Sequence, residues 1–245
     1  MRVFDAHLHI VDPRFPLTGG YRPLPFTVED YLARVASLGV CGGAVVSGSF
    51  QGFDQAYLVD ALERLGPRFV GVTQLPASVP RAEIERLHHA GVRGVRVNLR
   101  RGGSEGAERL EDLARHVHAV AGWHVELYVD GRALPALETR LARLPRLSID
   151  HLGMHADGLP ALLRLVERGA RVKASGFGRV ELDVPATLRA IARVDPSALL
   201  FGSDLPSTRA PRPFDPADVD VLVDALGAEL AARALYDNAV AWYRP

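Results

Sequence analysis

The sequence predicts a (β/α)8 barrel. Its 245 residues match the roughly 250 residues typical of that fold. Short apolar runs alternate with longer segments of helical period along the whole chain, which favours a parallel sheet. Hydrophobic residues make up 48% of the chain and charged residues 24%, as in a folded globular protein. We therefore expect a single barrel domain over residues 1–245.

The pattern gives eight strand-helix units in order. Strands are expected at 3–10, 43–47, 69–74, 94–99, 125–129, 147–151, 171–175 and 199–203, and helices at 27–38, 54–65, 80–90, 108–121, 132–143, 158–168, 184–194 and 215–238. Thr27 is a candidate N-cap, because acidic residues follow it directly. An open doubly wound sheet would share this alternation, but eight units in this length favour closure. No G-x-G-x-x-G follows the first strand.

Charge and cysteine content restrict the partners. The 29 basic residues balance 29 acidic residues, so no overall field attracts nucleic acid or an anionic bilayer. Cys41 is the only cysteine, which excludes an intramolecular disulfide and fits a reducing compartment. No apolar run approaches the ~18 residues of a membrane span. We expect a cytoplasmic protein with a small-molecule partner, and the sequence leaves its oligomeric state open.

A histidine pair marks the first strand. In Asp5-Ala6-His7-Leu8-His9 the two-residue period of a strand predicts Asp5, His7 and His9 on one face. Two imidazoles would then enter the barrel mouth together. By itself this spacing fits hydrogen-bonded core histidines equally well, so the interpretation depends on partners from other strands.

Two such partners follow the sixth and eighth strands. Asp150-His151 ends the sixth strand, and Gly202-Ser203-Asp204-Leu205-Pro206 ends the eighth. A buried carboxylate beside histidines can act as a general base or as a metal ligand. The structural alternative for Asp204 is a helix N-cap or a turn residue.

These motifs together resemble the amidohydrolase superfamily. The H-x-H on strand one, Asp-His-x-Gly after strand six and Gly-Ser-Asp-x-Pro after strand eight are similar to its amidohydrolase-related branch. The segments 91–98, 122–125 and 237–243 resemble the lactonases of that branch, which act on 2-pyrone-4,6-dicarboxylate or on sugar acids. The likeness runs from Phe4 to Tyr243.

The resemblance implies a barrel that opens a lactone. Asp204 would activate water, and the histidines His7, His9 and His151 would polarise the carbonyl or orient the water. Arg96, Tyr128 and Arg179 match positions that contact a carboxylated substrate. A guanidinium also suits bidentate carboxylate binding, which predicts an anionic substrate. The alternative for both arginines is a structural salt bridge.

The departures from the family leave the substrate open. Met154 replaces the proline usual after Asp-His-x-Gly, Leu205 replaces an aromatic residue, and the segment 47–52 differs. The roles of Arg100, Arg101, His155 and the 206–216 loop are not predicted, although that loop follows a strand's carboxyl end and could cover a substrate.

The metal requirement is a separate question. Strands four and five contain no lysine to carry a bridging carbamate, so we expect no binuclear centre and no required cofactor. A mononuclear zinc could still use His7, His9 and Asp204. Two alternatives stay open: a metal-dependent decarboxylase or amide hydrolase of the same superfamily, and a barrel that binds a ligand without turnover.

The other conspicuous residues are interpreted as structural. Lys173, early in strand seven, and His124, at the start of strand five, are expected to pack within the fold. Four histidines on helical segments are expected at the surface: His88, His89, His116 and His118.

Overall fold

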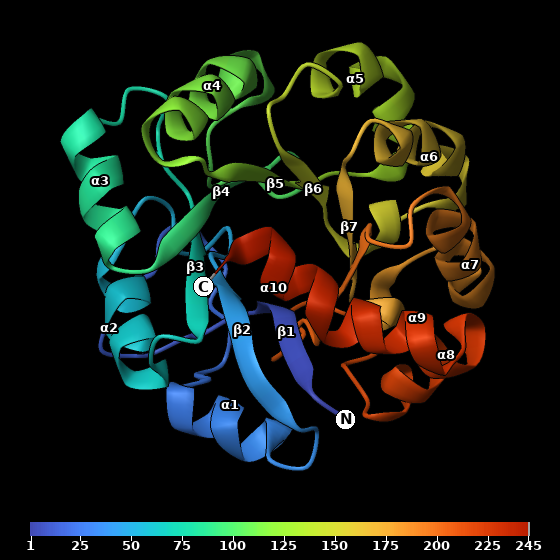
Figure 1. Cartoon of the computed structure of the whole chain (residues 1–245). Helices are drawn as coiled ribbons and strands as arrows, with labels where there is room; N and C mark the ends of the chain where they lie inside the picture. The colour runs from blue at the N-terminus through green and yellow to red at the C-terminus, as the bar shows by residue number, and fades with distance from the viewer. Residues whose placement is uncertain (245) are drawn as a thin grey trace.

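The computed structural model describes residues 1–244 and contains the expected barrel. Eight parallel strands lie side by side in chain order, and helices surround them (Figure 1). The strands are β1 (Val3–Leu8), β2 (Val40–Val46), β3 (Phe69–Thr73), β4 (Val92–Asn98), β5 (His124–Tyr128), β6 (Leu147–Ile149), β7 (Arg171–Ala174) and β8 (Leu199–Phe201). The helices are α1 (Val28–Val35), α2 (Ala56–Leu65), α3 (Arg81–His89), α4 (Leu110–Ala121), α5 (Leu134–Leu141), α6 (Leu159–Glu167), α7 (Val184–Val194), α8 (Ala217–Leu226), α9 (Ala228–Ala232) and α10 (Asn238–Tyr243).

Backbone hydrogen bonds link the first strand to the segment after the last. The Asp204 N–H donates to the His7 carbonyl at 2.7 Å, and the His9 N–H donates to the Leu205 carbonyl at 2.7 Å. These bonds join the ends of β1 and β8 at the carboxyl edge of the sheet, where active sites of such barrels lie. They bring Asp204 beside the two histidines.

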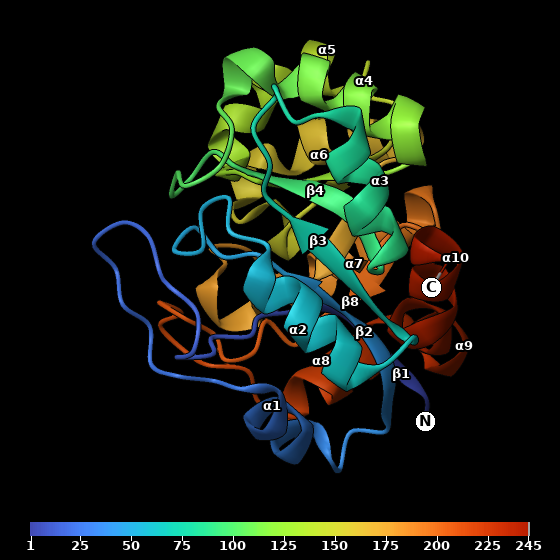
Figure 2. The ribbon, with the colours of Figure 1, turned by 90° about the vertical axis from the view of Figure 1, so that its left-hand side faces the viewer.

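Two apolar clusters form the core. The larger fills the space between strands and helices, with members such as Leu8, Tyr31 and Leu58. The smaller contains Phe4, Val46, Val72, Trp242 and Tyr243. Its last two members come from α10, which lies across the end of the barrel that faces the viewer in Figure 1 and lies opposite most of the long loops in Figure 2. We call this cluster the floor and the opposite end the mouth.

The predicted single helix over 215–238 is wrong. The chain forms α8, breaks at Gly227, and continues through α9 and a π-helical turn (Arg233–Asp237) into α10. Gly227 has φ 76° and ψ 164°, a conformation that a helix cannot contain and that glycine adopts without steric cost. The break turns the chain so that α10 can close the floor.

The other elements follow the prediction with boundaries displaced by a few residues. Strand β1 ends at Leu8 rather than residue 10, and β2 begins at Val40 rather than residue 43. Thr27 caps α1 as expected, in a reciprocal capping box with Asp30. Within residues 1–244 no helix has the length and apolar character that a bilayer crossing requires.

Candidate active site

An irregularity in β1 places its histidines. Asp5 pairs with Gly43 and Leu8 with Val45, so β1 contains one residue more than β2 over this interval. The bulge breaks the two-residue period. Asp5 therefore faces α1, where the Tyr31 hydroxyl donates to Oδ2 at 3.1 Å. The prediction that Asp5 shares a face with His7 and His9 is wrong, whereas the two imidazoles do lie together, with ring centroids 5.0 Å apart.

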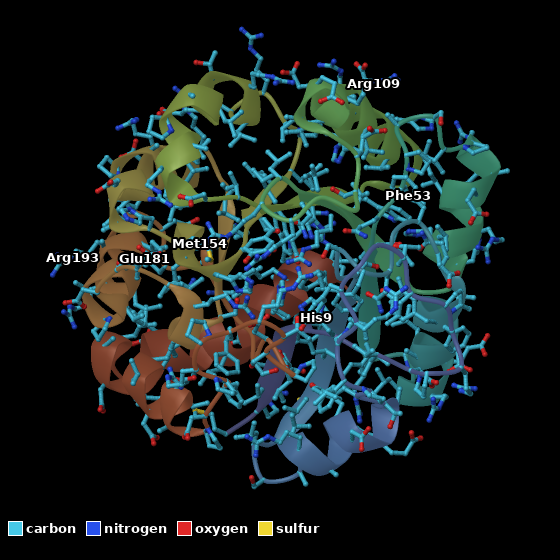
Figure 3. The ribbon with its side chains drawn as sticks, turned by 180° about the vertical axis from the view of Figure 1, so that it is seen from behind. His9, Phe53, Arg109, Met154, Glu181 and Arg193 are labelled. Atoms are coloured by element: carbon cyan, nitrogen blue, oxygen red, sulfur yellow. The ribbon has the colours of Figure 1, made fainter. Side chains whose placement is uncertain are left out.

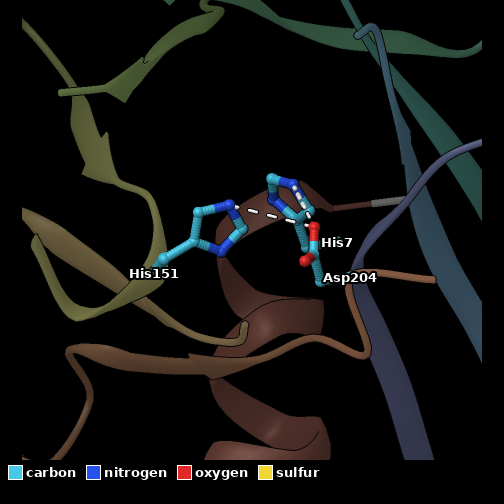
Figure 4. A group of neighbouring side chains, drawn as sticks. All are labelled: His7, His151 and Asp204. Atoms are coloured by element: carbon cyan, nitrogen blue, oxygen red, sulfur yellow. Dashed lines mark ion pairs between the residues drawn. The ribbon is translucent and has the colours of Figure 1, made fainter. Parts of the chain in front are cut away.

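Asp204 lies at the centre of the mouth. Its Oδ1 is 3.8 Å from His7 Nε2, 3.6 Å from His9 Nε2 and 3.8 Å from His151 Nε2 (Figure 4). These side chains are buried and come from the ends of β1, β6 and β8. Asp204 and His151 have φ values of 59° and 48°, a left-handed conformation that is uncommon for non-glycine residues and is enriched at active sites. The structure thus brings the four predicted catalytic residues together.

Arg179 controls the charge of Asp204. Its Nε donates to Asp204 Oδ2 at 2.8 Å, and its Nη2 contacts the same oxygen. Burial alone would raise the pKa of Asp204, but the Arg179 guanidinium holds that pKa below its ordinary value. Asp204 is therefore ionised at neutral pH. Burial lowers the pKa values of His7 and His151 well below that of a free imidazole, so both rings are neutral.

Hydrogen bonds orient the imidazoles of His9 and His151. His9 Nδ1 lies 2.7 Å from the Val46 carbonyl oxygen, which can only accept, so Nδ1 carries a proton, and in the neutral ring Nε2 carries the lone pair. His151 Nδ1 lies 2.9 Å from Ser175 Oγ, a group that can donate or accept. His9 therefore presents an acceptor toward Asp204. Figure 3, seen from the mouth, places His9 near the barrel axis.

A layer of charge lies below the histidines, and Glu126 is the member of it that sequence reasoning missed. Glu126 on β5 and Lys173 on β7 are fully buried and form an ion pair with an N–O distance of 2.6 Å. Arg96 on β4 donates from Nε and Nη2 to Asp150 Oδ2, at 3.1 and 2.7 Å. Charged residues in the middle of apolar parallel strands were the available signal, since such strands normally carry no charge.

The three predicted substrate-binding residues line one cavity beside Asp204. Arg96, Tyr128 and Arg179 lie on its wall, together with Asn98 and Arg101. Arg96 uses Nε, Nη1 and Nη2 to bind Asp150 and the Ser47 carbonyl, which leaves one N–H on each terminal nitrogen. Arg96 therefore forms a salt bridge, which was the structural alternative, and its role in binding substrate stays a prediction.

Loops from three units form the rim of this cavity. The Arg209 guanidinium lies 3.5 Å from the Tyr21 ring centroid, and the Tyr21 and Phe50 rings are 6.0 Å apart. Thr208 and Arg209, from the 206–216 loop, contribute to the lining. The cavity measures only about 30 Å³, the room of a few waters.

The residues whose roles were open are now placed. Arg101 lines the cavity, whereas Arg100 pairs with Asp130 at 2.6 Å. His155 lies outside the cavity lining, where its Nδ1 accepts from the Asp157 N–H and its Nε2 is 3.7 Å from Glu181.

Three of the four helical histidines, which were predicted at the surface, are half-buried and hydrogen-bonded to neighbouring segments. His88 Nδ1 accepts the indole N–H of Trp123 at 3.1 Å, and His116 and His118 bond the carbonyl oxygens of Val79 and Trp123. They are half-buried because each ties a helix to a neighbouring segment, and only His89 is exposed. His124 packs as expected against Trp242, with ring centroids 5.1 Å apart.

The donor set at the mouth suits a divalent metal ion. His7, His151 and Asp204 offer ligand atoms that all lie within 4.8 Å of one another, and so do His7, Glu126 and Asp150. His7 Nε2 and Asp204 Oδ1 are buried and have no hydrogen-bond partner among residues 1–244. Imidazole nitrogen and carboxylate oxygen are zinc ligands. In the second set, however, Glu126 already binds the ammonium of Lys173.

A family model described as Amidohydrolase matches residues 4–244. The chain belongs to the amidohydrolase family. Among curated members, it is 28% identical to the 2-pyrone-4,6-dicarboxylate hydrolase of Comamonas testosteroni, over 98% of this chain and 90% of that protein. It is 27% identical to the D-galactarolactone isomerase of Agrobacterium fabrum, over 98% of this chain and 90% of that protein. These relatives confirm the resemblance that the motifs indicated.

The fold is shared with a solved structure, and the sequence with a further relative. A protein of Agrobacterium tumefaciens has the same fold, with a TM-score of 0.89 and 24% sequence identity, over 100% of this chain and 97% of that one. A 4-sulfomuconolactone hydrolase of Rhizobium radiobacter is 28% identical to the present amidohydrolase, over 96% of this chain and 87% of that protein.

Proposed function

We propose that this amidohydrolase opens a carboxylated lactone by attack of water on the ester carbonyl. One observation carries the proposal: an ionised, buried carboxylate, Asp204, converges with three imidazoles beside a cavity lined by arginines. The relatives named as lactone hydrolases and as a lactone isomerase support the substrate class. The converging groups argue against a barrel that only binds its ligand, because each is placed to act on one atom.

Asp204 is the proposed general base. Its Oδ1 is free to accept a proton from water, while Oδ2 is engaged with Arg179. His9 Nε2, an acceptor, would hold the second proton of that water. The Arg179 interaction weakens Asp204 as a base, since it lowers the pKa of the carboxyl. A substrate carboxylate that draws Arg179 away would restore that basicity, so binding and activation are coupled.

The substrate carboxylate would meet Arg179 and the two unused donors of Arg96. Tyr128, whose hydroxyl has no hydrogen-bond partner within residues 1–244, would add a third donor. The lactone carbonyl would then lie toward His151. Because the cavity is about 30 Å³, a ring must displace rim side chains, and the exposed Arg209 is the one best placed to move.

A metal-assisted reaction is the second candidate. His7, His9, His151 and Asp204 fit a zinc ion, which would supply a Lewis acid for the carbonyl and lower the pKa of bound water. The unpartnered His7 Nε2 and Asp204 Oδ1 favour this candidate. A cyclic ester needs less activation than an amide, so we expect hydrolysis to persist without the ion, as the ion-pair and hydrogen-bond geometry already orients the reacting groups.

The test is a screen of lactones by acid release, with each carboxylated lactone paired with its methyl ester. We expect turnover of the carboxylated member and weak turnover of the ester, before and after exhaustive chelation. Arg179→Met should reduce this preference, because the charge-assisted bond it removes is worth about 1.5–3 kcal/mol. Activity lost with the metal and restored by zinc would favour the second candidate, and no lactone turnover would overturn both.

A further inference from the structure

Two carboxylates lie below His7, on the side away from the cavity. His7 Nδ1 is 3.3 Å from Glu126 Oε1 and 3.6 Å from Asp150 Oδ1, and each of the three side chains has zero exposure. The other ring nitrogen, Nε2, faces Asp204 Oδ1 at 3.8 Å. His7 therefore stands between an acidic layer and the reaction site.

A cation fixes each of these carboxylates. Lys173 Nζ lies 2.6 Å from Glu126 Oε2, and it also donates to the Tyr243 hydroxyl at 2.7 Å and to the carbonyl of Ala6, the residue before His7. Arg96 holds Asp150 through Oδ2. Lys173 is the only lysine of the chain. Burying it completely costs free energy unless it is paired, so its place opposite Glu126 fixes the direction in which that carboxylate points.

The acidic layer determines which nitrogen of His7 carries the proton. A carboxylate only accepts hydrogen bonds, and a neutral imidazole has one N–H to give. The Lys173 ammonium holds the pKa of Glu126 well below its ordinary value, whereas burial raises the pKa of Asp150 to about 7. Glu126 Oε1 lies 3.3 Å from Nδ1, closer than Asp204 Oδ1 lies to Nε2, at 3.8 Å. An N–H at Nδ1 faces this buried charge, whereas an N–H at Nε2 would place the Nδ1 lone pair against Glu126.

We infer that Glu126, anchored by Lys173, is a positioning residue that keeps the proton of His7 on Nδ1 and leaves Nε2 as an acceptor. The inference rests on the proposed function for its catalytic consequence. His7 and His9 then both present lone pairs to the site, and either one can accept the water proton that Asp204 does not take. With no N–H directed at the site, neither His7 nor His9 can donate to the lactone carbonyl. The expectation that they polarise this carbonyl is therefore dropped, and other donors must do so.

The variant Glu126→Gln makes the inference testable. Lys173 has no lone pair, so the carboxamide introduced at position 126 must turn its oxygen to the ammonium and its NH₂ to His7. That NH₂ would take the place of Glu126 Oε1, which is closer to Nδ1 than Asp150 Oδ1 is, at 3.3 against 3.6 Å, so we expect the His7 proton to move from Nδ1 to Nε2. Shape and volume are retained. The matched control is Glu138→Gln, which removes a surface carboxylate paired with Arg164.

The experiment is a long-range ¹H–¹⁵N correlation spectrum of chelated, ¹⁵N-histidine-labelled protein, with His7 assigned by the loss of its signals in His7→Gln. We expect a protonated Nδ1 at His7 in the wild type and in the control, and a protonated Nε2 in Glu126→Gln. We also expect kcat of Glu126→Gln to fall about 10–100-fold while KM changes little.

Two results would overturn the inference: a protonated Nε2 in the wild type, or a folded Glu126→Gln variant that keeps the Nδ1 proton. The wild-type spectrum alone can overturn the inference, even if the variant fails to fold. It requires no substrate, so failure of the lactonase proposal would be seen separately, as an absence of turnover with the predicted tautomer intact.

Discussion

The two ends of the barrel interior differ in what fills them. The floor holds Phe4, Trp242 and Tyr243, with Phe4 and Tyr243 stacked at a centroid distance of 5.6 Å. The mouth holds ionised and imidazole groups that are equally buried, including Asp204 at 2% exposure. Apolar burial at the floor stabilises the fold, whereas burial of charge at the mouth costs free energy unless each group is paired. Along the barrel axis, the residues that stabilise the fold therefore lie at the floor and the reactive groups lie at the mouth.

Lys173 and Glu126 lie where the two ends meet. Lys173 reaches the floor through Tyr243 and the mouth through Glu126. If the floor serves stability and the mouth serves chemistry, floor substitutions should change the free energy of unfolding and mouth substitutions should change turnover. Substitutions of Lys173 or Glu126 should change both.

Removing the proposed base should have the largest effect. We expect Asp204→Asn to lower kcat/KM roughly 10²–10⁴-fold, because the amide keeps the volume but cannot take the proton of water. The thermal midpoint should change little. The control is Asp183→Asn, since asparagine also caps helices well and Asp183 caps α7. A folded Asp204→Asn protein with full lactone turnover would contradict the base assignment.

A floor substitution should show the opposite pattern. Trp242 is 8% exposed and packs against His124, with the Arg146 guanidinium 4.1 Å from the centroid of its ring. Trp242→Ala should lower the free energy of unfolding by about 3–5 kcal/mol. Turnover per folded molecule should be unchanged, and this is measured by combining denaturant unfolding with active-fraction kinetics. If Trp242→Ala lost turnover but kept its stability, the proposal that the floor serves stability and the mouth serves chemistry would be wrong.

Acid should weaken the fold by a smaller, graded amount. Burial lowers the pKa of His124 to about 3, from an ordinary value near 6.5. Between these values the unfolded chain binds a proton that the folded chain does not, so stability falls as pH drops from about 6.5 toward 3. The contribution is on the order of a few kcal/mol.

Burial also lowers the pKa values of His7 and His151 at the mouth, so they contribute to acid destabilisation as well. The variant His124→Gln separates the contribution of His124 from theirs. Its unfolding free energy, measured by urea titration at a series of pH values, should decline less steeply in acid than that of the wild type. Identical slopes would show that His124 does not carry the effect.

The sequence was sufficient for most of the barrel and for the residues around Asp204. Motifs at strand ends predict position because the carboxyl ends of parallel strands converge. The face of Asp5 could not be predicted, since a bulge breaks the alternation and its signal lies in the pairing with β2. Glu126 and Lys173 belong to no motif, and their meaning appears only when the folded sheet places β5 and β7 on either side of β6 and pairs the two side chains.

The metal site illustrates the same limit. His7, His9 and Asp204 were the predicted ligands, yet His151 completes the tight group with His7 and Asp204. Which imidazoles converge within a few ångströms depends on loop conformations after β6, where His151 and Leu152 have positive φ values. Spacing in the sequence does not encode those angles.

Attack of water on the ester carbonyl is the central claim, and isotope labelling tests it most directly. The measurement is turnover of the preferred carboxylated lactone in H₂¹⁸O, with the product fragmented in a mass spectrometer. We predict one ¹⁸O atom in the new carboxylate and none in the released hydroxyl. A ring-shifted lactone without ¹⁸O would identify an isomerase instead, and ¹⁸O in the hydroxyl would show that water attacks the alkyl carbon; either result would contradict the account.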